Sequence, residues 1–494
     1  MCAAVDRSFA TYARPSKRLR MRGALLCAFL AAACLSRPAF AETLQQALVD
    51  AYLYNPALQA ARANLRATDE GVPLAKSALR PTITGTADAG ILYTRSNRGG
   101  GGPVIDPFGN PLGGFGFSDD EGTTYPHSYG VTINQSVFQG FQNLNAIRGA
   151  KAAVQAGREG LRATEQDILL RTAIAYVDVV RDQAVVRLRE NDVKVLTEQL
   201  KATRDRFDVG EVTRTDVAQA EARRSEALAT LAGAQAVLKT SRAAYQQVVG
   251  HPPGNLATPP SIRHLLPTSL NDVSTIADGE NPQILTAVYN EEASLYAVEQ
   301  AIGGLLPDVS ISASYNKNFA GNEDGDVSES ASVFGSLTVP FYQGGAVSAQ
   351  VRQAKEDNNA AKRQVEDARL SVHANALSQW GVLQSSGPAI EAAQAAVSAN
   401  TIALDGVREE EKVGQRTTLD VLDAQRELLN TQIGLVSALR DRVVAEYSLY
   451  AAIGRMDAQA LGLDTPYYDP IEHYDIVKNK WFGLRPPGPP AADN

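Results

Sequence analysis

Two aspartates near the end of the chain, Asp420 and Asp423, are the residues whose type and spacing best fit a functional site. They lie three residues apart in a helical pattern, so their carboxylates share one face of a helix. Where copies of a chain meet around an axis, such carboxylates form stacked rings that attract cations and resist anions. A solvated helix start is the alternative, because the helix dipole favours acidic residues near its N-terminus. The two residues alone leave both interpretations open.

Catalytic chemistry is not expected from the other polar residues. The sequence has no nucleophile-elbow motif and no spacing typical of metal ligands. Its cysteines and histidines are few and scattered, at Cys2, Cys27 and Cys34 and at His127, His251, His264, His373 and His473. We therefore expect no enzyme activity, no cofactor and no metal site. The net charge of −8 also argues against a nucleic-acid partner.

The first 41 residues are predicted to be a signal peptide. Basic residues precede the apolar run 23–35, and the small-x-small cleavage site Ala39-Phe40-Ala41 follows that run. A membrane anchor would need about 20 apolar residues, and this run is shorter. We expect an exported chain without disulfides, because all the cysteines precede the cleavage site. Lipid modification of Cys34 is a less favoured alternative, since only alanines stand directly before it.

A two-fold repeat organises the rest of the chain. The segment 413–420, Val-Gly-Gln-Arg-Thr-Thr-Leu-Asp, matches the segment 209–216, Val-Gly-Glu-Val-Thr-Arg-Thr-Asp, which begins 204 residues earlier. The equivalent of Asp423 in the first copy is Gln219. The predicted order is a signal peptide, a first repeat, a connector, a second repeat and a C-terminal segment with a mobile end, over residues 1–41, 42–250, 251–280, 281–454 and 455–494.

Long coiled-coil helices are predicted in each repeat. After Gly140 a helical pattern continues to about Phe207, and some 65 residues at about 1.5 Å each make a rod of roughly 100 Å. Each rod ends at Val-Gly-x-x-Thr, where glycine permits the positive φ of a helical hairpin turn, and a second helix returns to Gly250 or Gly454. Apolar residues recur at every seventh position in the first rod, at Ile147, Val154, Leu161 and Ile168.

A shorter helix is expected at the start of each repeat. The first is predicted from Thr43 to about Leu79, with Thr43 as its cap and a kink at Asn55-Pro56. The second is predicted from Asn281-Pro282 to about Leu306.

The apolar period falls to two after each short helix, which predicts the β-hairpins 82–138 and 308–340 with one apolar and one small-polar face. A long loop is expected in the first hairpin, from about Arg95 to His127. Strands of about ten residues with one apolar face can cross an outer-membrane hydrocarbon layer. Four strands cannot close a barrel, so either several copies combine their strands or the sheet is not in a membrane.

The chain resembles the TolC-type family of bacterial outer membrane factors. The resemblance rests on the segments 339–345, 347–351, 413–414 and 420–424, which read Val-Pro-Phe-Tyr-Gln-Gly-Gly, Val-Ser-Ala-Gln-Val, Val-Gly and Asp-Val-Leu-Asp-Ala. It implies a homotrimer, with four strands from each chain in a twelve-stranded transmembrane β-barrel and the helices in a hollow barrel that extends into the periplasm. The implied function is an export channel that works with a periplasmic adaptor and an inner-membrane ABC or proton-driven transporter.

The resemblance also implies roles for residues at the hairpin turns. Asp420 and Asp423 match aspartates that line the family's periplasmic constriction. Arg416 matches an arginine that holds the gate shut, and Thr215 and Asp216 match its partners on a neighbouring hairpin. At Glu411 the best-known member has a tyrosine, so repulsion from Asp216 is expected to loosen this latch. The residues expected to meet the adaptor are Val209, Gly210, Thr213, Val413, Gly414 and Thr417.

Two further choices remain open in the sequence. A soluble periplasmic coiled-coil scaffold would explain the heptads, but it would not explain the signal peptide or the alternating strands. Within the channel interpretation, the tail 468–483 is similar to the branch that serves type I protein secretion. Efflux of small molecules is the alternative cargo.

Overall fold

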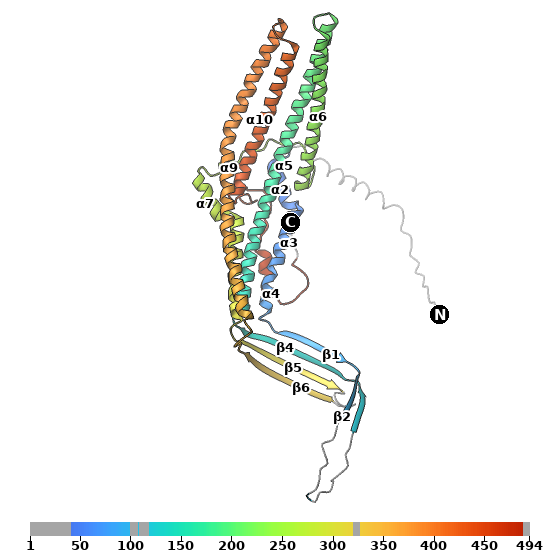
Figure 1. Cartoon of the computed structure of the whole chain (residues 1–494), viewed down its shortest axis with the longest axis vertical. Helices are drawn as coiled ribbons and strands as arrows, with labels where there is room; N and C mark the ends of the chain where they lie inside the picture. Colours follow the sequence, from blue (N-terminus) through green and yellow to red (C-terminus); the bar gives the residue numbers. More distant parts are fainter. Residues whose placement is uncertain (1–40, 99–106, 108–117, 320–326, 488–494) are drawn as a thin grey trace, which may run out of the picture.

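The computed structural model describes residues 41–98, 107, 118–319 and 327–487. Residues 1–40, with Cys34 and nearly all of the predicted signal peptide, lie outside the described part, as does the end of the C-terminal tail. The molecule is elongated, with two long helical hairpins at one end and a β-sheet at the other (Figure 1). The described chain is mainly α-helical with a β portion, as predicted.

The predicted rods are confirmed. Helices α5 (Gln142–Asp208) and α9 (Ala346–Lys412) have 67 residues each, and α6 (Arg214–Val249) and α10 (Thr418–Ala452) run back beside them. The four residues of the first heptad series are all buried. Long helices of this kind are stabilised by packing along such a seam rather than by propensity alone.

The helix predicted from Thr43 to Leu79 is interrupted. It consists of α2 (Leu44–Tyr54), α3 (Pro56–Asp69) and α4 (Gly71–Ser77). Thr43 caps α2 as expected, but Asn55 ends α2 and caps α3 instead of bending one helix. The break is stabilised because the Asn55 side chain accepts hydrogen bonds from the first turn of α3 and donates to the Val248 carbonyl at 2.8 Å.

The second repeat uses the same joint. Asn281 caps α8 (Pro282–Gly303) and its side chain donates to the Ala452 carbonyl at 2.9 Å. In each repeat, an asparagine therefore joins the end of the returning helix, α6 or α10, to the start of a shorter helix. The connector is less irregular than expected, because it holds η1 (Arg263–Leu265) and ends in α7 (Leu270–Glu280), which lies against α9.

The C-terminal segment returns to the first repeat. Its short helix α11 (Glu472–Val477) packs on α3, and the guanidinium of Arg62 lies over the rings of Tyr52 and Tyr468. The main apolar core lies at this middle level of the molecule, around Leu48, Tyr176 and Met456.

The sheet contains both predicted hairpins. Its strands are β1 (Thr82–Ala89), β4 (His127–Gln139), β5 (Asp308–Phe319) and β6 (Val327–Thr338), antiparallel and in the order β1-β4-β5-β6. The expected loop after Arg95 is shorter than predicted, because β2 (Leu92–Arg98) and β3 (Ser118–Thr124) pair as a separate ribbon. The polar sequence of β3 lacks the alternation by which strands are found.

The register places apolar and polar side chains on opposite faces of the sheet. Ile83, Ile133, Ala313 and Val333 are successive cross-strand neighbours in one row. The next row contains Thr84, Thr132, Ser314 and Ser332 and belongs to the other face. Within the chain the apolar face is uncovered, since Ile83 is 70% and Val333 is 73% exposed.

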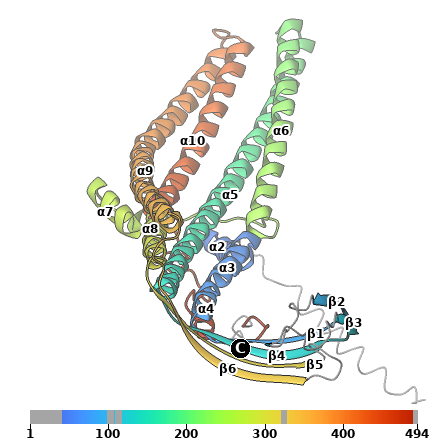
Figure 2. The ribbon, with the colours of Figure 1, turned by 60° about the horizontal axis from the view of Figure 1, so that its bottom comes forward.

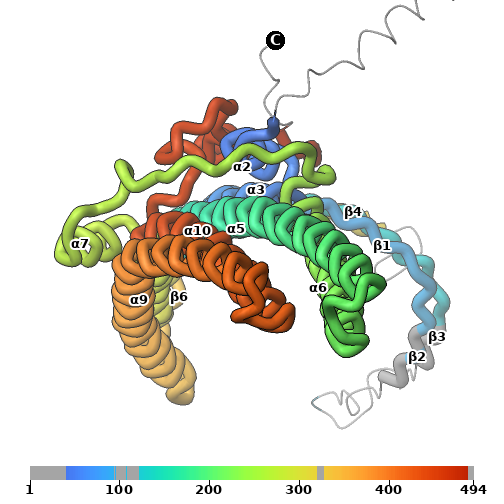
Figure 3. Tube along the Cα trace, turned by 90° about the horizontal axis from the view of Figure 1, so that it is seen from above, coloured from blue at the N-terminus to red at the C-terminus, as the bar shows by residue number. Residues whose placement is uncertain are grey.

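The long helices form a curved row in the order α9, α10, α5, α6 (Figure 3). Helices α2 and α3, the connector and the C-terminal segment lie on its convex side. The α5/α6 and α9/α10 hairpins diverge toward their tips (Figure 2). Among the described helices, none is both long and apolar enough to cross a membrane.

Candidate functional site: the tips of the helical hairpins

The two hairpin turns have the same backbone geometry. After α5 the chain turns at Gly210 with φ 82°, and after α9 it turns at Gly414 with φ 77°. In each turn the amide after the glycine donates back to the helix, from Glu211 to Arg206 and from Gln415 to Glu410, both at 2.9 Å. Glycine is required because other residues seldom adopt a positive φ. Val209 and Val413 precede these glycines and are exposed.

The returning helices begin with matching capping boxes. Thr213 caps α6 and Thr417 caps α10, each with an aspartate three residues on. Oδ2 of Asp420 accepts hydrogen bonds from the backbone nitrogen and the hydroxyl of Thr417 at 2.9 and 2.8 Å. These bonds hold the pKa of Asp420 below its usual value, and the equivalent bonds from Thr213 lower the pKa of Asp216. Asp420 is therefore both a helix cap and a fixed negative charge.

Asp423 has a different environment from Asp420. Its Oδ1 lies 2.8 Å from Nη2 of Arg223 on α6 and 3.3 Å from Nη2 of Arg426 on its own helix. Two guanidinium groups thus offset the Asp423 charge. Both aspartates lie near the start of α10, but within one chain they differ in electrostatic character.

Arg416 lies in the second turn and pairs within its own hairpin. Its Nε is 2.9 Å from Oε2 of Glu410, and both side chains are about half exposed. Thr215 is exposed and Asp216 is engaged in its cap, so within one chain the three predicted latch residues do not come together. The Asp216 carboxylate uses Oδ2 for the cap, which leaves Oδ1 for a further donor.

Glu411 is not opposed by Asp216 within the chain. Its Oε1 lies 2.5 Å from Nη1 of Arg206 on α5. Within one chain Glu411 thus forms an ion pair between the two hairpins, and the repulsion expected in the latch stays a prediction. The side chains of Arg206 and Glu411 are 39% and 14% exposed, so this ion pair is partly buried and less screened by solvent than a fully exposed pair.

Further links join the hairpins below their tips. Leu196, Ala227 and Leu422 form a small buried cluster between α5, α6 and α10. Lower down, Nε of Arg440 on α10 lies 2.8 Å from Oδ1 of Asp178 on α5. The hairpins are therefore joined by buried apolar contacts and an ion pair lower down, and by partly buried ion pairs at the tips.

Arg206 and Arg223 are the tip residues that sequence reasoning missed. Their partners are 205 and 200 residues away, so no local spacing reveals them. The repeat does carry a signal. Arg206 in the first repeat is equivalent to Glu410 in the second, which directly precedes its partner Glu411. Opposite charges at equivalent positions of the two repeats would have indicated this pair.

The chain matches known proteins over most of its length. The family described as outer membrane efflux protein matches residues 47–251 and 274–455. Outer membrane efflux protein BepC of Brucella suis is 43% identical over 451 residues, which cover 91% of this chain and 93% of BepC. Outer membrane protein TolC of Escherichia coli is 28% identical and covers 85% and 84% of the two chains. Alkaline protease secretion protein AprF of Pseudomonas aeruginosa is 25% identical and covers 67% and 70%.

Solved channel structures share the fold. The Campylobacter jejuni CmeC outer membrane channel superposes with a TM-score of 0.71 at 16% sequence identity, over 88% of this chain and 89% of CmeC. At that identity the likeness concerns the fold alone. The sequence matches and the elongated helical and β architecture agree, and the chain therefore belongs to the outer membrane efflux protein family and is an outer membrane channel protein.

Proposed function

We propose that three copies of this chain assemble into a continuous conduit across the outer membrane and the periplasm, closed at the hairpin tips and opened by a periplasmic adaptor and an inner-membrane transporter. The observation that carries the proposal is the open four-stranded sheet with an uncovered apolar face, joined in one chain to a curved row of long helices.

The sheet supports assembly through its edges. Strands β1 and β6 each have a neighbour on one side within this sheet. A backbone polar group that is left unpaired in hydrocarbon costs roughly several kcal/mol. We therefore expect β1 of one copy to pair with β6 of the next. The apolar row then faces lipid and the threonine and serine row faces water. The curved helical row supplies one sector of the periplasmic tube in the same way.

The tips supply the gate in this proposal. Asp420 and Asp423 from three copies form the constriction, and Arg416 exchanges Glu410 for Thr215 and Asp216 of a neighbouring copy in the closed state. The free Oδ1 of Asp216 suits this role because a guanidinium can bind it without breaking the helix cap. The exposed turn residues Val209, Gly210, Thr213, Val413, Gly414 and Thr417 form the surface that meets the adaptor.

Small molecules are the cargo that the sequence relationships favour. The relative with 43% identity is described as an efflux protein, and it is matched over 93% of its length. Type I protein secretion, which the tail 468–483 favours, is the second candidate. AprF, a protease secretion protein, supports it, although at 25% identity.

Native mass spectrometry and planar-bilayer recordings of the detergent-purified protein test the conduit. We expect a trimer with a small, cation-preferring conductance. Asp420→Ala/Asp423→Ala should lose the cation preference, and Arg416→Ser should raise the conductance. Folded trimers without conductance would rule out the conduit. If both variants conduct as the wild type does, the gate does not lie at the tips. A deletion strain distinguishes the two cargoes. Higher drug susceptibility would indicate efflux of small molecules, and a loss of secreted protein would indicate type I secretion.

A further inference from the structure

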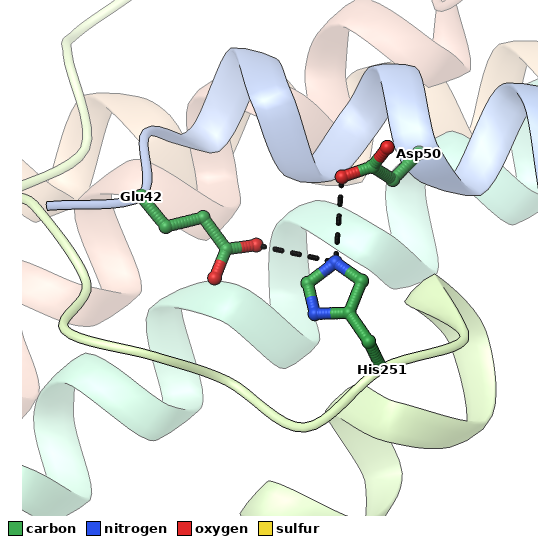
Figure 4. A group of neighbouring side chains, drawn as sticks. All are labelled: Glu42, Asp50 and His251. Atoms are coloured by element: carbon green, nitrogen blue, oxygen red, sulfur yellow. Dashed lines mark hydrogen bonds and ion pairs between the residues drawn. The ribbon is translucent and has the colours of Figure 1, made fainter. Parts of the chain in front are cut away.

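Three side chains from separate parts of the first repeat converge beside α2 (Figure 4). Helix α2 lies on the convex side of the row of long helices (Figure 3). Glu42 precedes α2, Asp50 lies on α2 and His251 follows the end of α6. We propose that Glu42, Asp50 and His251 bind a divalent transition-metal ion, with Zn²⁺ as the best fit. The site is separate from the tips and from the sheet, so it does not depend on the proposed function.

The distances between the ligand atoms fit a single ion. Nε2 of His251 lies 3.3 Å from Oδ2 of Asp50 and 3.6 Å from Oε1 of Glu42. Ligand atoms of the three residues all lie within 4.8 Å of one another. Bonds of about 2.1 Å in a tetrahedral zinc site separate two ligand atoms by roughly 3.4 Å. One ion can therefore reach all three residues with small side-chain adjustments.

The histidine is oriented for binding. Its Nδ1 lies 3.1 Å from the carbonyl oxygen of Pro252. A carbonyl can only accept a hydrogen bond, so Nδ1 carries the proton and Nε2 faces the two carboxylates. Metal-binding histidines use this arrangement, in which the other ring nitrogen donates to a backbone carbonyl and fixes the tautomer. Between two carboxylates, Nε2 needs either a second proton or a cation.

Glu42 is also held in place by its surroundings. The hydroxyl of Tyr245, a fully buried residue, donates to Oε1, and the amide of Gly254 lies 3.4 Å from Oε2. The backbone of Glu42 forms two hydrogen bonds with the connector. Its nitrogen donates to the carbonyl of Asn255 at 2.7 Å, and its carbonyl accepts from the nitrogen of Ala257 at 2.9 Å. This support reduces the conformational entropy that an ion must overcome to bind.

The composition and the exposure of the site select the class of ion. One imidazole and two carboxylates suit Zn²⁺ and its neighbours, whereas Mg²⁺ and Ca²⁺ prefer all-oxygen sites. The side chains of His251, Asp50 and Glu42 are 42%, 36% and 16% exposed, so water can supply a fourth ligand. A bound ion would link Glu42 and His251, the first residue of the connector, to Asp50 on α2. His251 is 201 residues from Asp50, which explains why sequence spacing does not reveal the site.

The test is zinc binding to the tag-free protein in detergent, after dialysis against a chelator. Intact mass must show that Glu42 is retained. We expect one Zn²⁺ per chain by isothermal titration and metal analysis, and a higher melting temperature that EDTA reverses. His251→Gln and Asp50→Asn should each weaken binding by at least about tenfold and remove the thermal shift. Mg²⁺ should give neither effect.

His373→Gln is the matched control. His373 lies 2.7 Å from Asp278 and has a comparable exposure, but it has no place in the three-residue cluster. This variant should bind zinc as the wild type does. A wild-type protein that binds no stoichiometric zinc would overturn the proposal and leave only the contacts between His251 and the two carboxylates. Equal binding by wild type and His251→Gln would place the ion elsewhere and also overturn it.

Discussion

Nη2 of Arg223 lies 2.8 Å from Oδ1 of Asp423, which joins α6 of the first hairpin to α10 of the second. The repeats differ at this link, because the residue equivalent to Asp423 in the first repeat is the neutral Gln219. The acid in this pair is therefore specific to the second repeat, and it belongs to the predicted constriction.

Arg223→Ala is expected to loosen the tip. Without this arginine, α10 loses a charged tie to α6, and the hairpins can separate more easily near the gate. We expect conductance in planar bilayers to rise by about twofold or more, since one weak link of about 1 kcal/mol corresponds to a severalfold population shift. Arg206→Ala, which frees Glu411, should act in the same direction.

Arg363→Ala is the control for both variants. Arg363 forms an exposed ion pair with Glu366 on the same helix, at 2.7 Å, and has no ion pair with another element among the described residues. Its loss should leave the conductance unchanged. If Arg223→Ala and Arg363→Ala behave alike, the pair between Arg223 and Asp423 does not restrain the tip.

Asp420→Ala should reduce cation preference more than Asp423→Ala. In the described part of the chain, Asp420 has a lowered pKa and is hydrogen-bonded to Thr417 rather than to an arginine, although the charge of Arg416 acts on it. Asp423, in contrast, contacts both Arg223 and Arg426 directly, and these two arginines offset its charge more strongly. Ion selectivity follows the net charge of a ring. Reversal potentials in a salt gradient would measure the two single variants. Equal losses of cation preference in the two variants would mean that Arg223 and Arg426 do not offset the Asp423 charge in the assembled channel.

The sequence predicts the repeated elements of the fold because their patterns are local. Heptads define α5 and α9, alternation defines β1 and β5, and Val-Gly-x-x-Thr defines the turns at Gly210 and Gly414. The chain breaks at Asn55, where the sequence predicts only a kink. The Asn55 cap on α3 is local, but the hydrogen bond from its side chain to the Val248 carbonyl joins a distant helix and cannot be read from the sequence. Strand β3 was missed because its pairing with β2, rather than its own polar sequence, makes it a strand.

The candidate site shows the same division. Asp420, Arg416 and Thr417 were found at the tip because the motif that contains them is continuous in the sequence. Arg206 and Arg223 act through partners in the other repeat, so only the packing of the two hairpins reveals them. Pairing between copies, which the Arg416 latch requires, remains a prediction.

Acid should fray both tips. The pKa values of Asp216 and Asp420 are lowered in the folded chain, so the folded state binds fewer protons than the unfolded state. The stability from these caps is therefore complete above the ordinary value of about 3.9 and is lost as pH falls through the lowered folded values. Hydrogen exchange of the peptides 209–217 and 413–421, corrected for intrinsic rates, should accelerate below about pH 4.

Asp216→Asn/Asp420→Asn provides the matched comparison for the acid effect. The variant should exchange faster than wild type at pH 6, and the difference should shrink at lower pH, as the pH falls through the lowered pKa values of Asp216 and Asp420. A difference that persists at the lower pH would show that ionisation of the caps does not stabilise the tips.

His473→Ala should release the C-terminal segment. Nδ1 of His473 lies 3.0 Å from Oδ2 of the buried Asp69 on α3. Burial raises the pKa of Asp69, and the hydrogen bond from His473 opposes that rise. Loss of the histidine leaves a buried carboxyl without this partner, which costs about 1–3 kcal/mol. Limited trypsin digestion should then cut faster after Lys478 and Lys480. Asp475→Ala, which removes an exposed pair with Lys478, should change the digestion little.

Gly454→Ala should destabilise the chain more than Gly414→Ala, although both glycines have a positive φ, of 86° and 77°. The backbone conformation alone costs an alanine about 1–2 kcal/mol at either position. A Cβ on Gly414 would meet no atom within 4 Å, but on Gly454 it would lie 2.6 Å from Cα of Asn281. That overlap adds about 1–3 kcal/mol, because the backbone at the Asn281 joint must move. The melting temperatures of the two variants should therefore differ by several degrees. Equal melting temperatures would mean that the backbone between α10 and α8 can shift to accept the Cβ at little cost.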